Sequence, residues 1–245
     1  MENRTVDLRS AFAAGWACFK QHGLWLSLAY LVIGICVGII AIMTVGYSFV
    51  GLLVSAASDT VNGMNAWLVG GSGFVMSLVL MVLVLSLLGL VVEVAMDNLS
   101  LGLMSGRFEK LTFDAAKMPV WLYVKAFVVN LLVGLLCTLS LALFVVPFFF
   151  IAPRIVFAGL YQLAHPEAGI MESIAASWRM TEGNTLMLLL FLVSMVALSY
   201  VGSCIPLVGA VVVKAFFLLC TTAIYYQLDT QQDTHTSDDS IRTHQ

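Results

Sequence analysis

Residues 24–57 read LWLSLAYLVIGICVGIIAIMTVGYSFVGLLVSAA, a run without a single charged residue. An α-helix of about 20 consecutive apolar residues is long enough to cross the hydrocarbon core of a membrane. Because that core holds no water, the segment must bond its own backbone N–H and C=O groups, which a helix does. The run therefore predicts a membrane-spanning helix and an all-α fold.

The composition of the whole chain agrees with this prediction. Hydrophobic residues make up 61% of the chain and charged residues 10%, whereas soluble domains have roughly 45–50% apolar and about 25% charged residues. We predict one polytopic transmembrane helical domain, residues 1–228, and a polar tail, residues 229–245, too polar to bury a core and therefore disordered. Six spans are expected, near residues 24–46, 74–104, 121–143, 147–163, 185–201 and 207–228.

The region before and within the first span has two features that bear on packing. Residues 6–21 place four large apolar side chains on one helical stripe, which fits either an interfacial amphipathic helix or a short helix packed on the bundle. Gly34 and Gly38 have the spacing that lets helices approach closely, or else the spacing is chance. The four residues of the stripe are Leu8, Phe12, Trp16 and Phe19.

Two later runs are longer than one crossing needs. Residues 66–104 would reach roughly 58 Å as one helix, about twice the hydrocarbon thickness, so one end must leave the core, and the sequence leaves open which. Residues 121–163 are long enough for two spans. Pro147 is expected to begin the second of these, since a missing N–H costs little in a first turn, and Pro153 is expected to kink it.

Residues 166–184 predict a second amphipathic helix, because Ile170, Ile174 and Trp178 share one stripe. The segment from Phe148 to Asn184 joins an apolar span containing Ala152-Pro153 to the turn HPEAG and then to the motif SWRMTEGN. It resembles the S-W-x-x-T-x-G-N region of a bacterial membrane-protein superfamily. That superfamily includes the uncharacterised YciC-type inner-membrane proteins and the membrane domain of some glycerophosphoryl diester phosphodiesterases. The resemblance implies a six-span domain of a bacterial cytoplasmic membrane and no catalytic residues.

The positive charges fall on one side of a six-span arrangement, which predicts that side, with both termini, to be cytoplasmic. The net charge of −3 and the scattered basic residues indicate no nucleic-acid partner. The residues that set the orientation are Arg4, Arg9, Lys20, Arg107, Lys110, Lys117, Arg179 and Arg242.

Four charged residues lie inside apolar spans, where each needs a partner or a role because burial costs about 2.5–3.5 kcal/mol at a helix centre. They are Glu93, Asp97, Arg154 and Lys214. From matching depths we predict that Glu93 approaches Lys214 and that Asp97 approaches Arg154. The alternatives are structural ion pairs, a path for protons, ions or headgroups, and side chains that reach to the interface.

Trp178 and Arg179 form a second candidate site, where an indole and a guanidinium contact lipid headgroups or simply anchor the helix. No pattern indicates a metal site, a cofactor or a nucleophile: the five cysteines are scattered, and the histidines lie outside the spans. We therefore expect a non-enzymatic protein that organises the envelope or assists partners, in contact with lipid and with other membrane proteins or itself. A transporter or lipid carrier is the alternative, and an intramembrane lipid enzyme the third.

Overall fold

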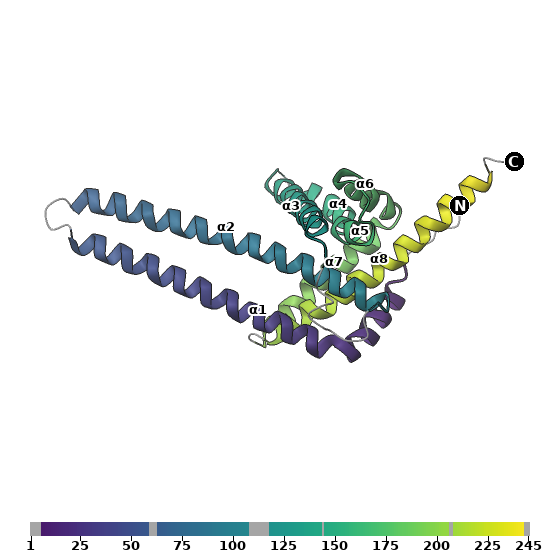
Figure 1. Cartoon of the computed structure of the whole chain (residues 1–245), viewed down its shortest axis with the longest axis horizontal. Helices are drawn as coiled ribbons and strands as arrows, with labels where there is room; N and C mark the ends of the chain where they lie inside the picture. Colours follow the sequence, from purple (N-terminus) through teal and green to yellow (C-terminus); the bar gives the residue numbers. More distant parts are fainter. Residues whose placement is uncertain (1–5, 59–62, 108–117, 144, 206–207, 243–245) are drawn as a thin grey trace. The chain divides into compact units, whose positions relative to one another are not determined.

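The computed structural model describes residues 6–58, 63–107, 118–143, 145–205 and 208–242, which form helices joined by short turns with no strand among them (Figure 1). This confirms the predicted all-α class. Within the described residues, α1, α2, α3, α7 and α8 are long and apolar enough to cross a membrane. The helices are α1 (Leu8–Ser58), α2 (Gly63–Met104), α3 (Val120–Leu143), α4 (Val145–Ile155), α5 (Ala158–Ala164), α6 (Ile170–Met180), α7 (Thr185–Ser203) and α8 (Val208–Arg242).

The chain divides into two compact units. We call Ala29–Val92 the hairpin, and Met1–Leu28 together with Glu93–Gln245 the bundle. All six candidate site residues of the sequence, the four intramembrane charges with Trp178 and Arg179, belong to the bundle.

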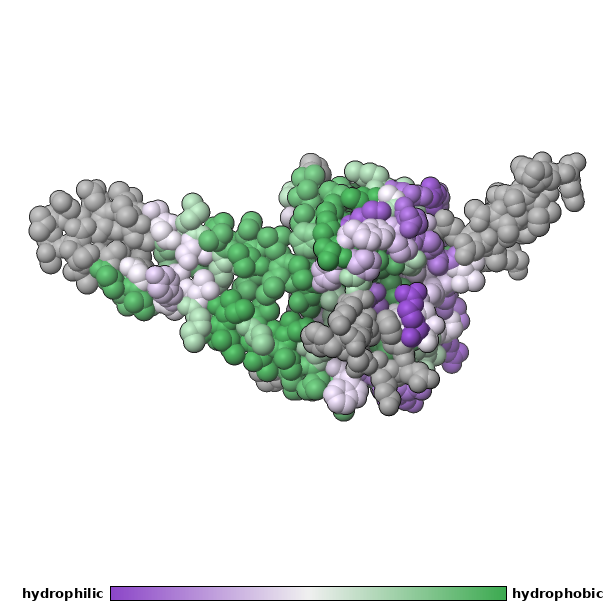
Figure 2. Space-filling model, in the orientation of Figure 1, coloured by the Kyte–Doolittle hydropathy of each residue, from purple (hydrophilic) through white to green (hydrophobic). Residues whose placement is uncertain are grey.

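The hairpin consists of long stretches of α1 and α2 with an apolar surface. The coloured part of that surface is mostly hydrophobic (Figure 2), and side chains such as Ile42 and Met76 are largely exposed. The Ser48 hydroxyl hydrogen-bonds the Ser77 hydroxyl and so links the two helices. No described atom lies within 4 Å of a Cβ built on Gly34 or Gly38, so the close helix contact considered for these glycines is not made by the part of the chain that is described.

Helix α1 is continuous, whereas the sequence suggested an amphipathic helix followed by a separate span. Gly23 stands at the expected break, but a glycine inside a helix costs only about 1 kcal/mol, too little to end one with apolar residues on both sides. The stripe before it packs on protein: the rings of Phe12, Trp16 and Phe19 lie 6.1, 5.9 and 5.7 Å from that of Phe216 in α8. Residues 6–21 therefore pack against α8 as the first part of α1, and Trp16 remains half-exposed.

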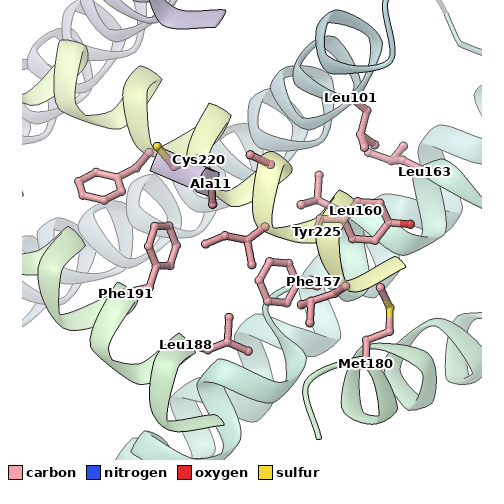
Figure 3. Packing of buried hydrophobic residues seen from close by; sticks show 14 of the residues in the cluster. Ala11, Leu101, Phe157, Leu160, Leu163, Met180, Leu188, Phe191, Cys220 and Tyr225 are labelled. Atoms are coloured by element: carbon pink, nitrogen blue, oxygen red, sulfur yellow. The ribbon is translucent and has the colours of Figure 1, made fainter. Parts of the chain in front are cut away.

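The core of the bundle is centred on Phe157, Leu188, Phe191, Phe217 and Tyr225, each no more than 2% exposed (Figure 3). They come from α7, α8 and the turn before α5. The rings of Phe191 and Phe217 lie 5.8 Å apart and nearly edge to face, an arrangement that aromatic pairs prefer. Residues far apart in sequence therefore share one core.

The contacts between α1 and α8 show how these two helices are oriented. Gln227 donates a hydrogen bond to the Ser10 hydroxyl at 2.8 Å, and a Cβ on Gly15 would stand 2.6 Å from the Cys220 sulfur. Because residue numbers rise in α1 as they fall in α8, the two helices are antiparallel. The N-terminal end of α1 therefore meets the C-terminal part of α8 at one end of the bundle.

The fourth predicted span, residues 147–163, is not one helix. Helix α4 ends at Ile155, within a turn of Pro153, and α5 begins at Ala158. Proline removes one backbone hydrogen bond and disturbs the helix around it, so the expected kink is here an interruption. The two short helices still run back along α3, since Asn130 of α3 lies against Gly159 of α5 while Lys125 reaches the turn after α5.

The polar segment 229–245, predicted to be disordered, is helical as far as Arg242. No glycine or proline follows Gly209 in the chain. Extending an existing helix avoids the unfavourable nucleation step that limits isolated helices. The packed part of α8 therefore nucleates the helix, and the polar segment extends it.

Candidate functional site

Asp97 of α2 is the centre of a charged cluster within the bundle. Glu93 lies one turn earlier on the same helix, and the charges of Glu93 and Lys214 both act on Asp97. Asp97 is partly buried, whereas Glu93 and Lys214 are exposed at the surface of the described residues. The structure thus brings together three of the four predicted charges.

A side chain from α3 completes this cluster. Asn130 approaches the Asp97 carboxylate as a hydrogen-bonding group, yet its buried Nδ2 has no partner in full hydrogen-bond geometry within the described ranges. Gly159 of α5 leaves room for the amide, because a Cβ at that position would overlap Asn130 Oδ1. Two carboxylates, one ammonium and one amide can hold a small cation or pass a proton. The sequence predicted neither Asn130 nor Gly159 as part of this site.

Arg154 does not have the partner that its depth in the span suggested. The sequence predicted a pair with Asp97, but the guanidinium instead lies 4.7 Å above the ring centre of Trp178 in α6. The Ser177 hydroxyl donates to the Arg154 carbonyl oxygen at 2.7 Å and ties α6 to α4. Position along a helix sets depth, whereas rotation about its axis sets the partner, and here α4 turns this side chain toward α6.

Helix α6 has three distinct sides. The side facing the bundle is small or polar and carries Ser173, Ala176, Ser177 and Met180. A second side, next to it around the helix, carries Ile170, Ile174, Met171 and Trp178, the last two 72% and 41% exposed. The third side carries Glu172 and Arg179, both exposed. The apolar stripe predicted from the sequence is therefore turned outward, and the packing surface is the small-residue side.

Three polar side chains hold the turn between α5 and α6, and two of them, Gln162 and Ser173, are fully buried. Gln162, which is fully buried, donates to the Ala168 carbonyl at 3.1 Å and accepts from the Ser173 hydroxyl at 2.9 Å. Lys125 of α3 donates to the carbonyls of Pro166 and Ala168 at 3.1 and 3.3 Å. The ammonium thus neutralises carbonyl dipoles, which explains a lysine inside an apolar helix. We call Lys125, Gln162 and Ser173 the turn clamp.

The motif SWRMTEGN forms the connection from α6 to α7. The Thr181 hydroxyl donates to the Ser177 carbonyl at 2.9 Å, and Gly183 has a φ of +83°, which L side chains rarely adopt. The Asn184 side chain accepts the Val6 N–H at 2.9 Å in a buried bond that crosses 178 positions of sequence. Thr181 and Asn184 are thus occupied in shaping the turn and in fixing the N-terminal segment, whereas Arg179 and Glu182 are exposed.

Lys125, Asn130 and Gln162 were missed by the sequence reasoning. The first two lie inside the predicted span 121–143, where a lysine or amide is as informative as the four charges that were considered. Gln162 lies at the end of the next span. Lys125 follows from counting every charge inside a span, and Asn130 and Gln162 follow from considering amides as well as charges.

Among the described residues no group of three His, Cys, Asp or Glu is placed to hold a metal ion. The cysteines Cys18, Cys36, Cys137, Cys204 and Cys220 are unpaired. Comparisons with protein-family models, curated proteins and solved structures give no match.

Proposed function

We propose that the chain is a non-enzymatic multi-pass protein of a bacterial cytoplasmic membrane that organises its membrane surroundings or assists a partner protein there. One observation supports this most: the side chains of Lys125, Gln162 and Ser173 bond backbone carbonyls or one another, and so fix the positions of α3, α5 and α6. The turn clamp is built this way, with Gln162 bonded at both ends of its amide. Such an arrangement holds α6 at the surface of the bundle, where it can contact a partner protein or lipid.

The proposed orientation has both termini in the cytoplasm. It is supported by the basic residues of the expected loops and by the contact of Gln227 with Ser10, because two chain ends that meet on one side require an even number of crossings. Six crossings follow if α4 and α5 together count as the fourth. The resemblance of residues 148–184 to YciC-type membrane proteins points the same way.

The test is purification of the tagged chain in mild detergent, with bound proteins and small molecules quantified by mass spectrometry. We expect a membrane protein in fixed stoichiometry, lost in Lys125→Met, which releases the turn between α5 and α6. Glu167→Gln, an exposed change in the same turn, is the matched control and should retain the partner. Enrichment or conversion of one small-molecule class by the wild-type protein would contradict the proposal.

A carrier is the second candidate, and the cluster of Glu93, Asp97, Asn130 and Lys214 supports it, since ionisable groups within spans mark many ion pathways. The test is proton flux into proteoliposomes that contain a trapped pH dye and carry an imposed membrane potential. A carrier predicts flux in the wild type and in Glu182→Gln, an exposed control, and loss of flux in Asp97→Asn. Equal flux in protein-free vesicles would reject this candidate.

A further inference from the structure

The guanidinium of Arg154 lies over the ring of Trp178. Its central carbon lies 4.7 Å from the centre of the Trp178 ring, and a cation over an indole is attracted to the ring. The five N–H donors of arginine point outward in the guanidinium plane. Within the described ranges, no side chain or carbonyl accepts a hydrogen bond from them and no carboxylate pairs with them, although the residue is half-buried. Its hydrogen-bonding capacity is therefore unused by the protein.

The residues around Arg154 limit which kind of ligand can reach its N–H donors. Trp178 belongs to the outward apolar side of α6, next to Met171, whereas Arg179 lies on the charged side of the same helix. A helix with one side against protein, one apolar and one charged fits the boundary between hydrocarbon and water, where tryptophan is enriched. Phospholipid phosphates lie at this depth. The guanidinium edge matches two phosphate oxygens, and such bidentate bonds are among the strongest in proteins.

The backbone of Arg154 is also preorganised by a hydrogen bond to α6. Its carbonyl accepts the Ser177 hydroxyl at 2.7 Å, so the backbone of α4 is tied to the helix that carries Trp178. Ser177 is itself fully buried. Little freedom remains to be lost when an anion binds, which favours affinity.

We propose that Arg154, held over the ring of Trp178, binds the phosphodiester of a membrane phospholipid at the edge of the bundle, with Arg179 of the same helix as Trp178 adding positive charge. This rests on the proposed membrane placement of α6 but not on the organising role. The site differs from the charged cluster around Asp97, to which the sequence had assigned Arg154. The lipid is recognised by its phosphate, while its acyl chains lie along the apolar side of α6.

The experiment is native mass spectrometry of the full chain in detergent, titrated with dioleoyl phosphatidylglycerol and, separately, with dioleoylglycerol, which lacks the phosphate. We expect phosphatidylglycerol to bind the wild type at least tenfold more tightly than dioleoylglycerol. Arg154→Gln should remove that preference, since charge-assisted bonds of this kind account for a tenfold change or more. Arg107→Gln removes the same charge at an exposed position and should keep it.

Trp178→Phe provides a second variant that keeps the apolar surface and weakens only the ring attraction, so a smaller loss of affinity is expected. The thermal transition of each variant shows whether the bundle is folded. Equal binding of the two lipids by the wild type, or an unchanged preference in folded Arg154→Gln, would overturn the proposal. Competition by millimolar inorganic phosphate would also overturn it, by identifying a soluble anion as the ligand. These outcomes leave the partner-assisting role untouched, because that role is tested by Lys125→Met.

Discussion

The turn clamp allows a stability prediction to be worked from its bonds. Replacing Gln162 with Leu removes the bond to the Ala168 carbonyl at 3.1 Å and the bond from the Ser173 hydroxyl at 2.9 Å. Each contributes about 1 kcal/mol net. The groups left behind keep other partners, because Ala168 still accepts from Lys125 at 3.3 Å and Ser173 still donates to Gly169 at 3.1 Å. We therefore expect Gln162→Leu to lower the free energy of unfolding by about 1–3 kcal/mol.

A double-mutant cycle isolates the bond between the two side chains. Ser173→Ala alone leaves the buried Gln162 carbonyl oxygen without its donor, at a cost of about 1–3 kcal/mol. In the double variant that oxygen is gone, so the combined loss should fall short of the sum by about 1–2 kcal/mol. If the bond between Ser173 and Gln162 is absent in the membrane-embedded protein, the effects of the two substitutions on the free energy of unfolding will add.

The assay is unfolding in mixed micelles, with helix content followed by circular dichroism as the denaturing detergent is increased. Ser203→Ala is the matched control: this exposed hydroxyl bonds only its own helix, at the Ser199 carbonyl. Its effect should stay within about 0.5 kcal/mol. A coupling energy below about 0.3 kcal/mol, or a Gln162→Leu effect as small as the control, would refute the reasoning.

Three further substitutions test other close contacts by the same unfolding measurement. Asn184→Ala should cost about 1–3 kcal/mol, because the buried Val6 N–H loses its acceptor, and it should also speed proteolysis of the N-terminal segment. Gly209→Val should disrupt the pairing of α7 with α8 and lower the yield of folded protein, since a Cβ there overlaps the Gly202 carbonyl. Gly183→Ala should cost about 1–2 kcal/mol from its positive φ alone, with no change in helix content before the transition.

The elements of this fold that were predictable follow from hydrophobic length. A run such as 121–143 contains little that would end a helix in lipid, and α3 occupies Val120–Leu143. The boundaries between helices were harder to predict. A separate first span was expected to begin at residue 24, whereas α1 runs through that point, and the interruption after Pro153 is larger than a kink. The effect of one glycine or proline on a helix depends on the packing of its neighbours, and that packing is not local to the sequence.

The candidate site shows a second limit, which concerns rotation. The acidic pair was predictable because Glu93 and Asp97 are one turn apart on a single helix. The partner of Asp97 was not, because depth along two helices leaves their rotation undetermined. Helix α6 illustrates the same limit: the sequence predicted its apolar stripe, but not that the small residues Ser173, Ala176 and Ser177 would face the bundle. In lipid, close packing favours small side chains at helix contacts, since lipid accommodates the large ones equally well. The outward position of Trp178, with the guanidinium carbon of Arg154 4.7 Å from its ring centre, agrees with that preference.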